Sequence, residues 1–262
     1  MTEEGFICHG LGDWGNPENQ LARENIETAF LYADAKTLAM FAGILNRAEE
    51  TELNTFAEEV KENYNRRLLQ KREDGRCAYR SYEHKDAFVT TQACEALPLY
   101  WGMVPEEYQD DVVQAFRETL ETKGAFVSGE VGLPYIIQCA RRYGMNDLIA
   151  SFVTKEEHPS YYAFVKDGMT TLGEYWETNP RSHCHDMMGH IIEWYYNGIA
   201  GIEILKPGMK EIRISPYIPH GMNHFVCTYL TPYGEICVKG IRIDGVQQFA
   251  WTLPEGIRNI TD

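Results

Sequence analysis

The length, composition and charge of the chain exclude several classes of protein. Its 262 residues, 44% of them apolar, suit one large domain, or one domain with a small appendage, and suffice for a substantial core. The formal net charge of -15 argues against a nucleic-acid partner, because binding to a phosphate backbone needs clustered Lys and Arg.

The location expected from the sequence is the cytoplasm. No run approaches the roughly 20 apolar residues of a membrane span, and the start, Met-Thr-Glu-Glu, lacks the basic end and apolar stretch of a secretory signal. The seven cysteines are odd in number and never form a C-x-x-C pair, which favours reduced thiols over disulfides or structural zinc. We therefore expect a protein without membrane, metal or cofactor.

The pattern up to about Ile202 is helical. Apolar residues recur at helical spacing from Ile26 to Leu45 and again from Phe56 to Tyr64, which predicts two helices joined by a tight turn. Short loops between helices favour antiparallel neighbours. Seven helices are predicted in all, near Glu24–Asn46, Glu52–Gln70, Ala87–Tyr100, Glu106–Thr122, Pro134–Tyr143, Asp147–Thr154 and His185–Ile199.

After Ile202 the pattern changes to short alternating runs bounded by Pro and Gly. The runs are "MKEIRISP", "HFVCTYLTP", "GEICVKGIRI" and "QQFAWTLP". Alternation of this kind predicts a small antiparallel β module. We therefore expect a helical domain over residues 1–202 and a β domain over residues 203–262.

The segment from Gly168 to Ile202 carries the strongest chemical signal. Glu174 stands between aromatic residues that could keep its carboxylate dry enough for acid-base work. The alternative is an ordinary loop glutamate that pairs with an arginine such as Arg181. Spacing alone does not decide between the two.

The histidines and aromatic rings of the same segment are also open to two interpretations. His183, Cys184, His185 and His190 could suggest a metal, but adjacent positions in a helical turn point in different directions and no acidic partner has ligand spacing. The rings of Trp14, Tyr175, Trp176 and Trp194 could stack on sugars, although aromatic residues more often belong to the core.

The joint order of five motifs resembles the C-terminal part of the α-L-rhamnosidases of glycoside hydrolase family 78. The motifs are "GDW" at Gly12–Trp14, "GEVGLPY" at Gly129–Tyr135, "TTLGEYW" at Thr170–Trp176, "SHCHDMMGHIIEW" at Ser182–Trp194 and "AGI" at Ala200–Ile202. Each motif alone is weak, but their order covers almost the full chain.

The resemblance implies a mainly α fold, a partial (α/α)6 six-hairpin toroid followed by a small antiparallel β-sandwich-like domain. It implies inverting hydrolysis of a terminal α-L-rhamnoside in a rhamnose-containing glycoside or oligosaccharide. Glu174 matches the family's general base and His185 its sugar-contacting histidine. Asp13, Trp14 and Trp176 would bind the substrate.

The sequence departs from the family pattern in three places. The family's general acid precedes Gly-Asp-Trp, and only eleven residues precede Gly12 here, so the chain is expected to be truncated. The family's Asn before the histidine is Cys184, and four strands are few for a closed sandwich. Glu130 is the first candidate for a replacement acid.

Two functions therefore stay open. The first is a rhamnosidase, or the base-bearing half of one. The second is a non-catalytic remnant that binds a sugar or a partner chain. Twelve helices complete such a toroid, and about seven are predicted here. An incomplete ring would leave an apolar edge exposed, so we expect the chain to associate with a partner or a second copy.

Overall fold

The structure is a computed structural model that describes residues 2–84, 86–178 and 181–261. It forms two compact units along the chain. The first comprises Met1–Cys139 and Phe152–Met188, and the second Ala140–Ser151 and Gly189–Asp262.

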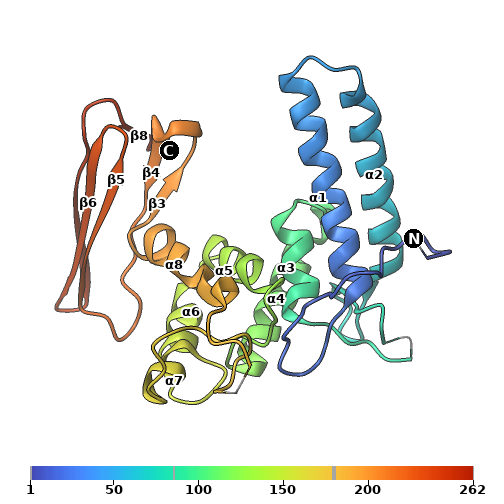
Figure 1. Cartoon of the computed structure of the whole chain (residues 1–262), viewed down its shortest axis with the longest axis horizontal. Helices are drawn as coiled ribbons and strands as arrows, with labels where there is room; N and C mark the ends of the chain where they lie inside the picture. The colour runs from blue at the N-terminus through green and yellow to red at the C-terminus, as the bar shows by residue number, and fades with distance from the viewer. Residues whose placement is uncertain (1, 85, 179–180, 262) are drawn as a thin grey trace. The chain divides into compact units, whose positions relative to one another are not determined.

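The first unit begins with a long helical hairpin, α1 (Arg23–Ile44) against α2 (Glu49–Leu68) (Figure 1). Small residues allow the close approach, since Ala29, Ala33 and Ala57 are almost completely buried. Asn46, at a φ of 52°, makes the tight turn between the helices. The hairpin was predicted from the apolar spacing and is confirmed.

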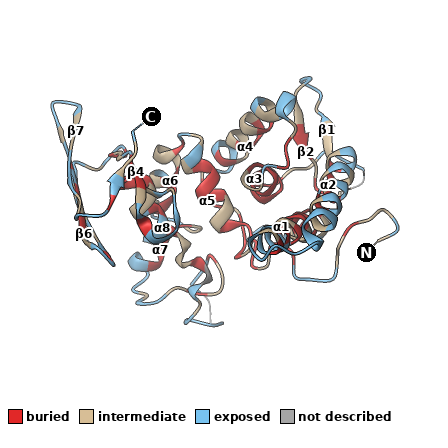
Figure 2. Ribbon diagram, turned by 90° about the horizontal axis from the view of Figure 1, so that it is seen from above, coloured by how far each residue is buried: buried red, intermediate tan, exposed pale blue. Residues whose placement is uncertain are grey.

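Helix α3 (Gln92–Tyr100) lies deepest in this unit, and Figure 2 shows it mostly in the colour of buried residues. Thr91 caps it, because its Oγ1 accepts a hydrogen bond from the N–H of Cys94 at 3.1 Å. Helix α4 (Gln109–Lys123) ends at Gly124, whose φ of 58° suits a helix C-terminus. A short hairpin, β1 (Leu69–Lys71) with β2 (Cys77–Tyr79), and helix α7 (Tyr161–Lys166) complete this unit.

The chain passes between the units in α5 (Leu133–Arg142) and α6 (Asn146–Val153). The predicted helix over His185–Ile199 is divided into a 3-10 turn at Asp186–His190, α8 (Ile191–Trp194) and a π-helical turn at Tyr195–Ile199. The wider turn brings the Trp194 ring over Gly198, where an added Cβ would lie 2.2 Å from the ring. The prediction of one continuous regular helix over these residues was therefore wrong.

Two small sheets form the rest of the second unit. The antiparallel sheet has the order β5 (His224–Thr231), β6 (Gly234–Ile243), β7 (Val246–Thr252). The other places β4 (Glu211–Ile214) between β3 (Ile202–Ile204) and β8 (Arg258–Asn259), with β8 parallel to β4. Apolar residues from both sheets and from the segments beside them share one core, formed by Ala200, Ile202, Met209, Ile212, Ile214, Ile236, Val238 and Ile257.

Each of the seven predicted helices and four predicted strand runs overlaps at least one element of the structure. Helix α7 and the strands β1, β2, β3 and β8 were not predicted, and all of them have at most six residues. Within the described ranges, no helix combines the length and the apolar character that crossing a membrane requires.

Candidate active site

Two loops that are far apart in sequence meet at the side chain of Glu174. The indole Nε1 of Trp14 donates a hydrogen bond to Oε1 of Glu174 at 3.3 Å, across 160 residues of sequence. The Trp14 and Tyr175 rings are tilted against each other, with centroids 6.3 Å apart. Glu174 and Trp14 are both half-buried, so a carboxylate and an aromatic ring reach the surface together.

A buried carboxylate fixes the loop that carries Trp14. Asp13 is 1% exposed and accepts hydrogen bonds from the backbone N–H groups of Gly129 and Gly132, each at 2.8 Å. The Ser128 hydroxyl and the Asn16 amide also donate to it, at 3.0 Å each. Burial raises the pKa of Asp13, while the hydrogen bonds act in the opposite direction.

The 129–132 turn packs directly on the Trp14 backbone. The N–H of Glu130 donates to the Trp14 carbonyl oxygen at 2.8 Å. A Cβ at Gly129 would lie 2.0 Å from the same oxygen, so only glycine fits there. The glycine-rich motif therefore sets the distance between the two loops.

A third segment brings His185 to the same place. The N–H of Glu174 donates to the Ser182 carbonyl at 3.1 Å, and the N–H of His185 donates to the Leu172 carbonyl at 3.2 Å. These bonds tie the two sides of the loop together, so Glu174 and His185 have fixed relative positions. Nε2 of His185 lies 2.9 Å from Oε1 of Glu130. Asp13, Trp14, Glu174 and His185 therefore lie close together in the first unit.

The structure corrects the predicted substrate contacts of Trp176 and Asp13. Trp176 is 3% exposed, its indole donates to the Ser128 carbonyl at 2.7 Å, and its ring stacks between Phe126 and Phe164. Asp13 is fully engaged by the four donors described above. Both residues therefore support the site from beneath, and neither has a surface to offer a sugar.

The surface of the site combines a carboxylate, a flat aromatic ring and an imidazole. An aromatic face can stack on a sugar ring, the imidazole can bond a hydroxyl, and a half-exposed carboxylate can accept a proton from water. Sequence reasoning missed the supporting roles of Ser128 and Gly132, although the dense glycines of "SGEVG" were a signal. Among the described residues, no three His, Cys, Asp or Glu side chains gather as metal ligands would.

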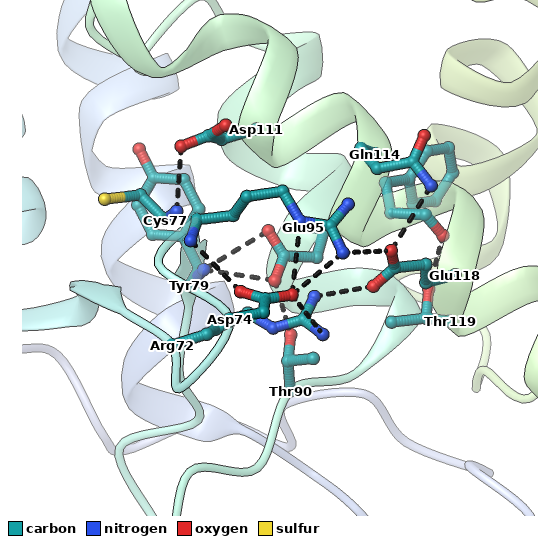
Figure 3. Close-up of polar contacts among 12 residues, drawn as sticks. Arg72, Asp74, Cys77, Tyr79, Thr90, Glu95, Asp111, Gln114, Glu118 and Thr119 are labelled. Carbon is teal, nitrogen blue, oxygen red and sulfur yellow. Dashed lines mark hydrogen bonds and ion pairs between the residues drawn. The ribbon is translucent and has the colours of Figure 1, made fainter.

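A second polar cluster lies around α3, and Figure 3 shows its contacts. Arg72 bonds Glu118 at 2.6 Å and lies 3.3 Å from Asp74, which also pairs with Arg76. Glu95 is fully buried beside them. The cluster borders an open cavity of about 1070 Å³, but its charged groups are already paired with one another. It has the character of a structural network.

Comparison with known proteins identifies the fold. The model of the bacterial alpha-L-rhamnosidase 6 hairpin glycosidase domain matches residues 2–199. The structure of alpha-L-rhamnosidase from Dictyoglumus thermophilum superposes with a TM-score of 0.84 at 26% identity, covering 95% of this chain and 28% of that one. Streptomyces avermitilis alpha-L-rhamnosidase, solved with L-rhamnose, gives a TM-score of 0.82 at 20% identity, over 96% of this chain and 24% of that one.

The sequence relatives agree with the solved structures. The alpha-L-rhamnosidase of Formosa agariphila is 28% identical over 256 residues, which cover 90% of this chain and 26% of the relative. That of Streptomyces avermitilis is 25% identical over 245 residues, 88% of this chain and 22% of the relative. The chain thus spans about a quarter of the length of these relatives. The predicted fold class is confirmed, and because the domain model covers residues 2–199, the chain belongs to the family of bacterial alpha-L-rhamnosidase six-hairpin glycosidase domains.

Proposed function

We propose that the site carries the general-base side of an inverting hydrolysis of terminal α-L-rhamnosides. The observation that carries this proposal is the contact of Trp14 with Glu174, which places a half-exposed carboxylate against an aromatic face. The names of the relatives and the L-rhamnose complex of one of them support the substrate class.

In this proposal Glu174 activates the attacking water. The water oxygen forms a bond to the anomeric carbon while its proton passes to the Glu174 carboxylate, and the bond from that carbon to the leaving oxygen breaks. The leaving oxygen takes a proton from a second carboxyl group, about 6.5–9.5 Å from the base in inverting enzymes. The Trp14 ring flanks the sugar, and His185 bonds one of its hydroxyl groups.

The alternative is a domain that binds a sugar or a partner without catalysis. It is kept because the chain spans about a quarter of its relatives' length, 26% for Formosa agariphila, and has no assigned general acid. A substrate whose leaving group needs no protonation separates the two functions. A 2,4-dinitrophenyl α-L-rhamnoside is suitable, because dinitrophenolate departs as a stable anion.

The test compares this substrate with wild type, Glu174→Gln and Glu59→Gln. The amide introduced by Glu174→Gln keeps the shape of the side chain but cannot take a proton, so turnover should fall about 10²- to 10⁴-fold with binding largely kept. Glu59 is exposed on α2, and its variant controls for the loss of one charge. We expect it to match wild type.

The outcomes distinguish the two functions. Release at an enzyme-like rate that Glu174→Gln abolishes, with the β anomer as first product by NMR, is the expected result. If Glu174→Gln keeps near-normal turnover, the carboxylate is not the base. If wild type and variant both release dinitrophenolate at the background rate, the binding function is favoured.

We also propose that α1 is covered by another protein surface, in the isolated chain by a second copy. Its C-terminal half and the residue that follows it leave large apolar side chains between 50% and 68% exposed, namely Leu38, Met40, Phe41, Ile44 and Leu45. Contiguous apolar surface of this kind usually marks an interaction site. The exposed face therefore supports association.

A further inference from the structure

Glu130 is a buried acid beside the proposed base, and the proposed reaction gives it no role. Its side chain is 5% exposed, whereas that of His185 is 27% exposed. Its backbone is anchored, because its N–H is bonded to the Trp14 carbonyl and the preceding Gly129 packs closely against the Trp14 backbone. The anchored main chain therefore restricts the position of the Glu130 carboxyl group.

The nearest group of opposite charge is the His185 ring. Nε2 and Oε1 are 2.9 Å apart, the distance of an ion pair, but Oε1 is buried and accepts no aligned hydrogen bond from the residues that the structure describes. A buried carboxylate without compensation is costly. The contact is stable as a carboxylate with an imidazolium, or as a carboxylic acid with a neutral ring, and either form holds one proton.

The other charges with the largest effect on Glu130 are negative. Burial raises the pKa of Glu130 most, the positive charge of His185 lowers it, and the negative charges of Glu174, Asp186 and Asp13 raise it further. Because several acids surround one imidazole, a proton held between Glu130 and His185 is favoured. Loss of that proton would add a negative charge next to Glu174, which must itself be ionised to act as a base.

We propose that Glu130 is a positioning residue that shares one proton with His185, which fixes the imidazole for sugar binding and keeps the pair neutral beside Glu174. The inference rests on the proposed function, since Glu174 and His185 are its base and its sugar contact. The burial of Oε1 favours this role over the general acid considered from the sequence, because an acid must reach the leaving oxygen.

The first part of the test asks whether the pair exists. The side-chain carboxyl carbon of Glu130 is followed by ¹³C NMR through a pH titration of wild type, His185→Gln and the control His224→Gln, an exposed histidine on β5. Removal of the His185 charge should raise the titration midpoint of Glu130, because that positive charge lowers its pKa. An unchanged midpoint in His185→Gln would overturn the proposal, whatever the enzyme activity.

The second part asks whether the pair positions the site. Glu130→Gln keeps the size and the acceptor oxygen but removes the charge, and we expect a Kd for L-rhamnose about tenfold weaker, with an unchanged melting temperature. Glu59→Gln should bind as wild type does. If wild type binds L-rhamnose and Glu130→Gln binds it equally well, only this inference fails. If wild type shows neither L-rhamnose binding nor a Glu174-dependent rate, the proposed function fails, and the positioning role fails with it.

Discussion

The buried carboxyl group of Glu95 should make the stability of the chain fall as the pH rises. Glu95 is 0% exposed on α3, and its oxygens accept hydrogen bonds from the Tyr79 N–H at 3.0 and 3.2 Å and from the Thr90 hydroxyl at 2.6 Å (Figure 3). Burial raises its pKa from 4.5 to about 8, although these hydrogen bonds and the charge of Arg72 act to lower it.

The size of the effect follows from this shift. A group whose pKa is higher in the folded than in the unfolded state binds more protons when folded, so folding loses stability as the pH rises between the two values. At about 1.4 kcal/mol per pH unit, a shift from 4.5 to about 8 corresponds to about 5 kcal/mol in total. About 3 kcal/mol of this is lost between pH 6 and pH 9.

The perturbation that tests this is Glu95→Gln, whose amide keeps the acceptor oxygen and does not titrate. Urea denaturation at pH 6 and pH 9 gives the free energy of unfolding of wild type, Glu95→Gln and the control Glu59→Gln. Wild type and control should lose about 3 kcal/mol more than Glu95→Gln over this interval. If all three lose the same amount, Glu95 does not titrate in this range and the reasoning is refuted.

Two further predictions concern the packing of the site loops and the exposed face of α1. Gly129→Ala places a methyl group 2.0 Å from the Trp14 carbonyl oxygen, so it should lower stability by about 1–3 kcal/mol and abolish L-rhamnose binding. Gly173→Ala meets no atom nearer than 3.6 Å and serves as its control in thermal melts; equal melting temperatures would contradict the steric argument. Wild type should self-associate at micromolar concentration in light scattering, and Phe41→Glu together with Leu38→Glu should give a monomer; a monomeric wild type would contradict the association.

The elements that could be predicted from the sequence are those with long local patterns. The 22 residues of α1 repeat their apolar spacing over several turns, so the ends of the helix were predicted to within two residues. Helix α7 has six residues, too few for a periodic signal, and β8 has two. Strand β8 exists only because β4, more than 40 residues earlier, pairs with it.

Some features of the candidate site could likewise be predicted from the sequence, and others could not. The order of motifs was enough to expect Trp14 near Glu174, because the family resemblance includes the packing of the loops. It did not reveal that Trp176 is buried, since its neighbours Phe126 and Phe164 come from separate parts of the chain. Three of the four donors to Asp13, namely Ser128, Gly129 and Gly132, lie more than 110 residues away, and no local pattern indicates them. The cytoplasmic location and the domain boundary at residue 202 stay predictions.

A sugar site at Trp14 and Glu174 is tested most directly by following the tryptophan indole N–H signals during an NMR titration with L-rhamnose. The chain has five tryptophans, and Trp14→Phe assigns the signal of the one that contacts Glu174. We expect a saturable shift of the Trp14 signal, while the signal of Trp176, which is buried and bonded to Ser128, stays in place. A titration that leaves the Trp14 signal unmoved, or that moves the signals of Trp194 or Trp251 instead, would contradict a sugar site at Glu174.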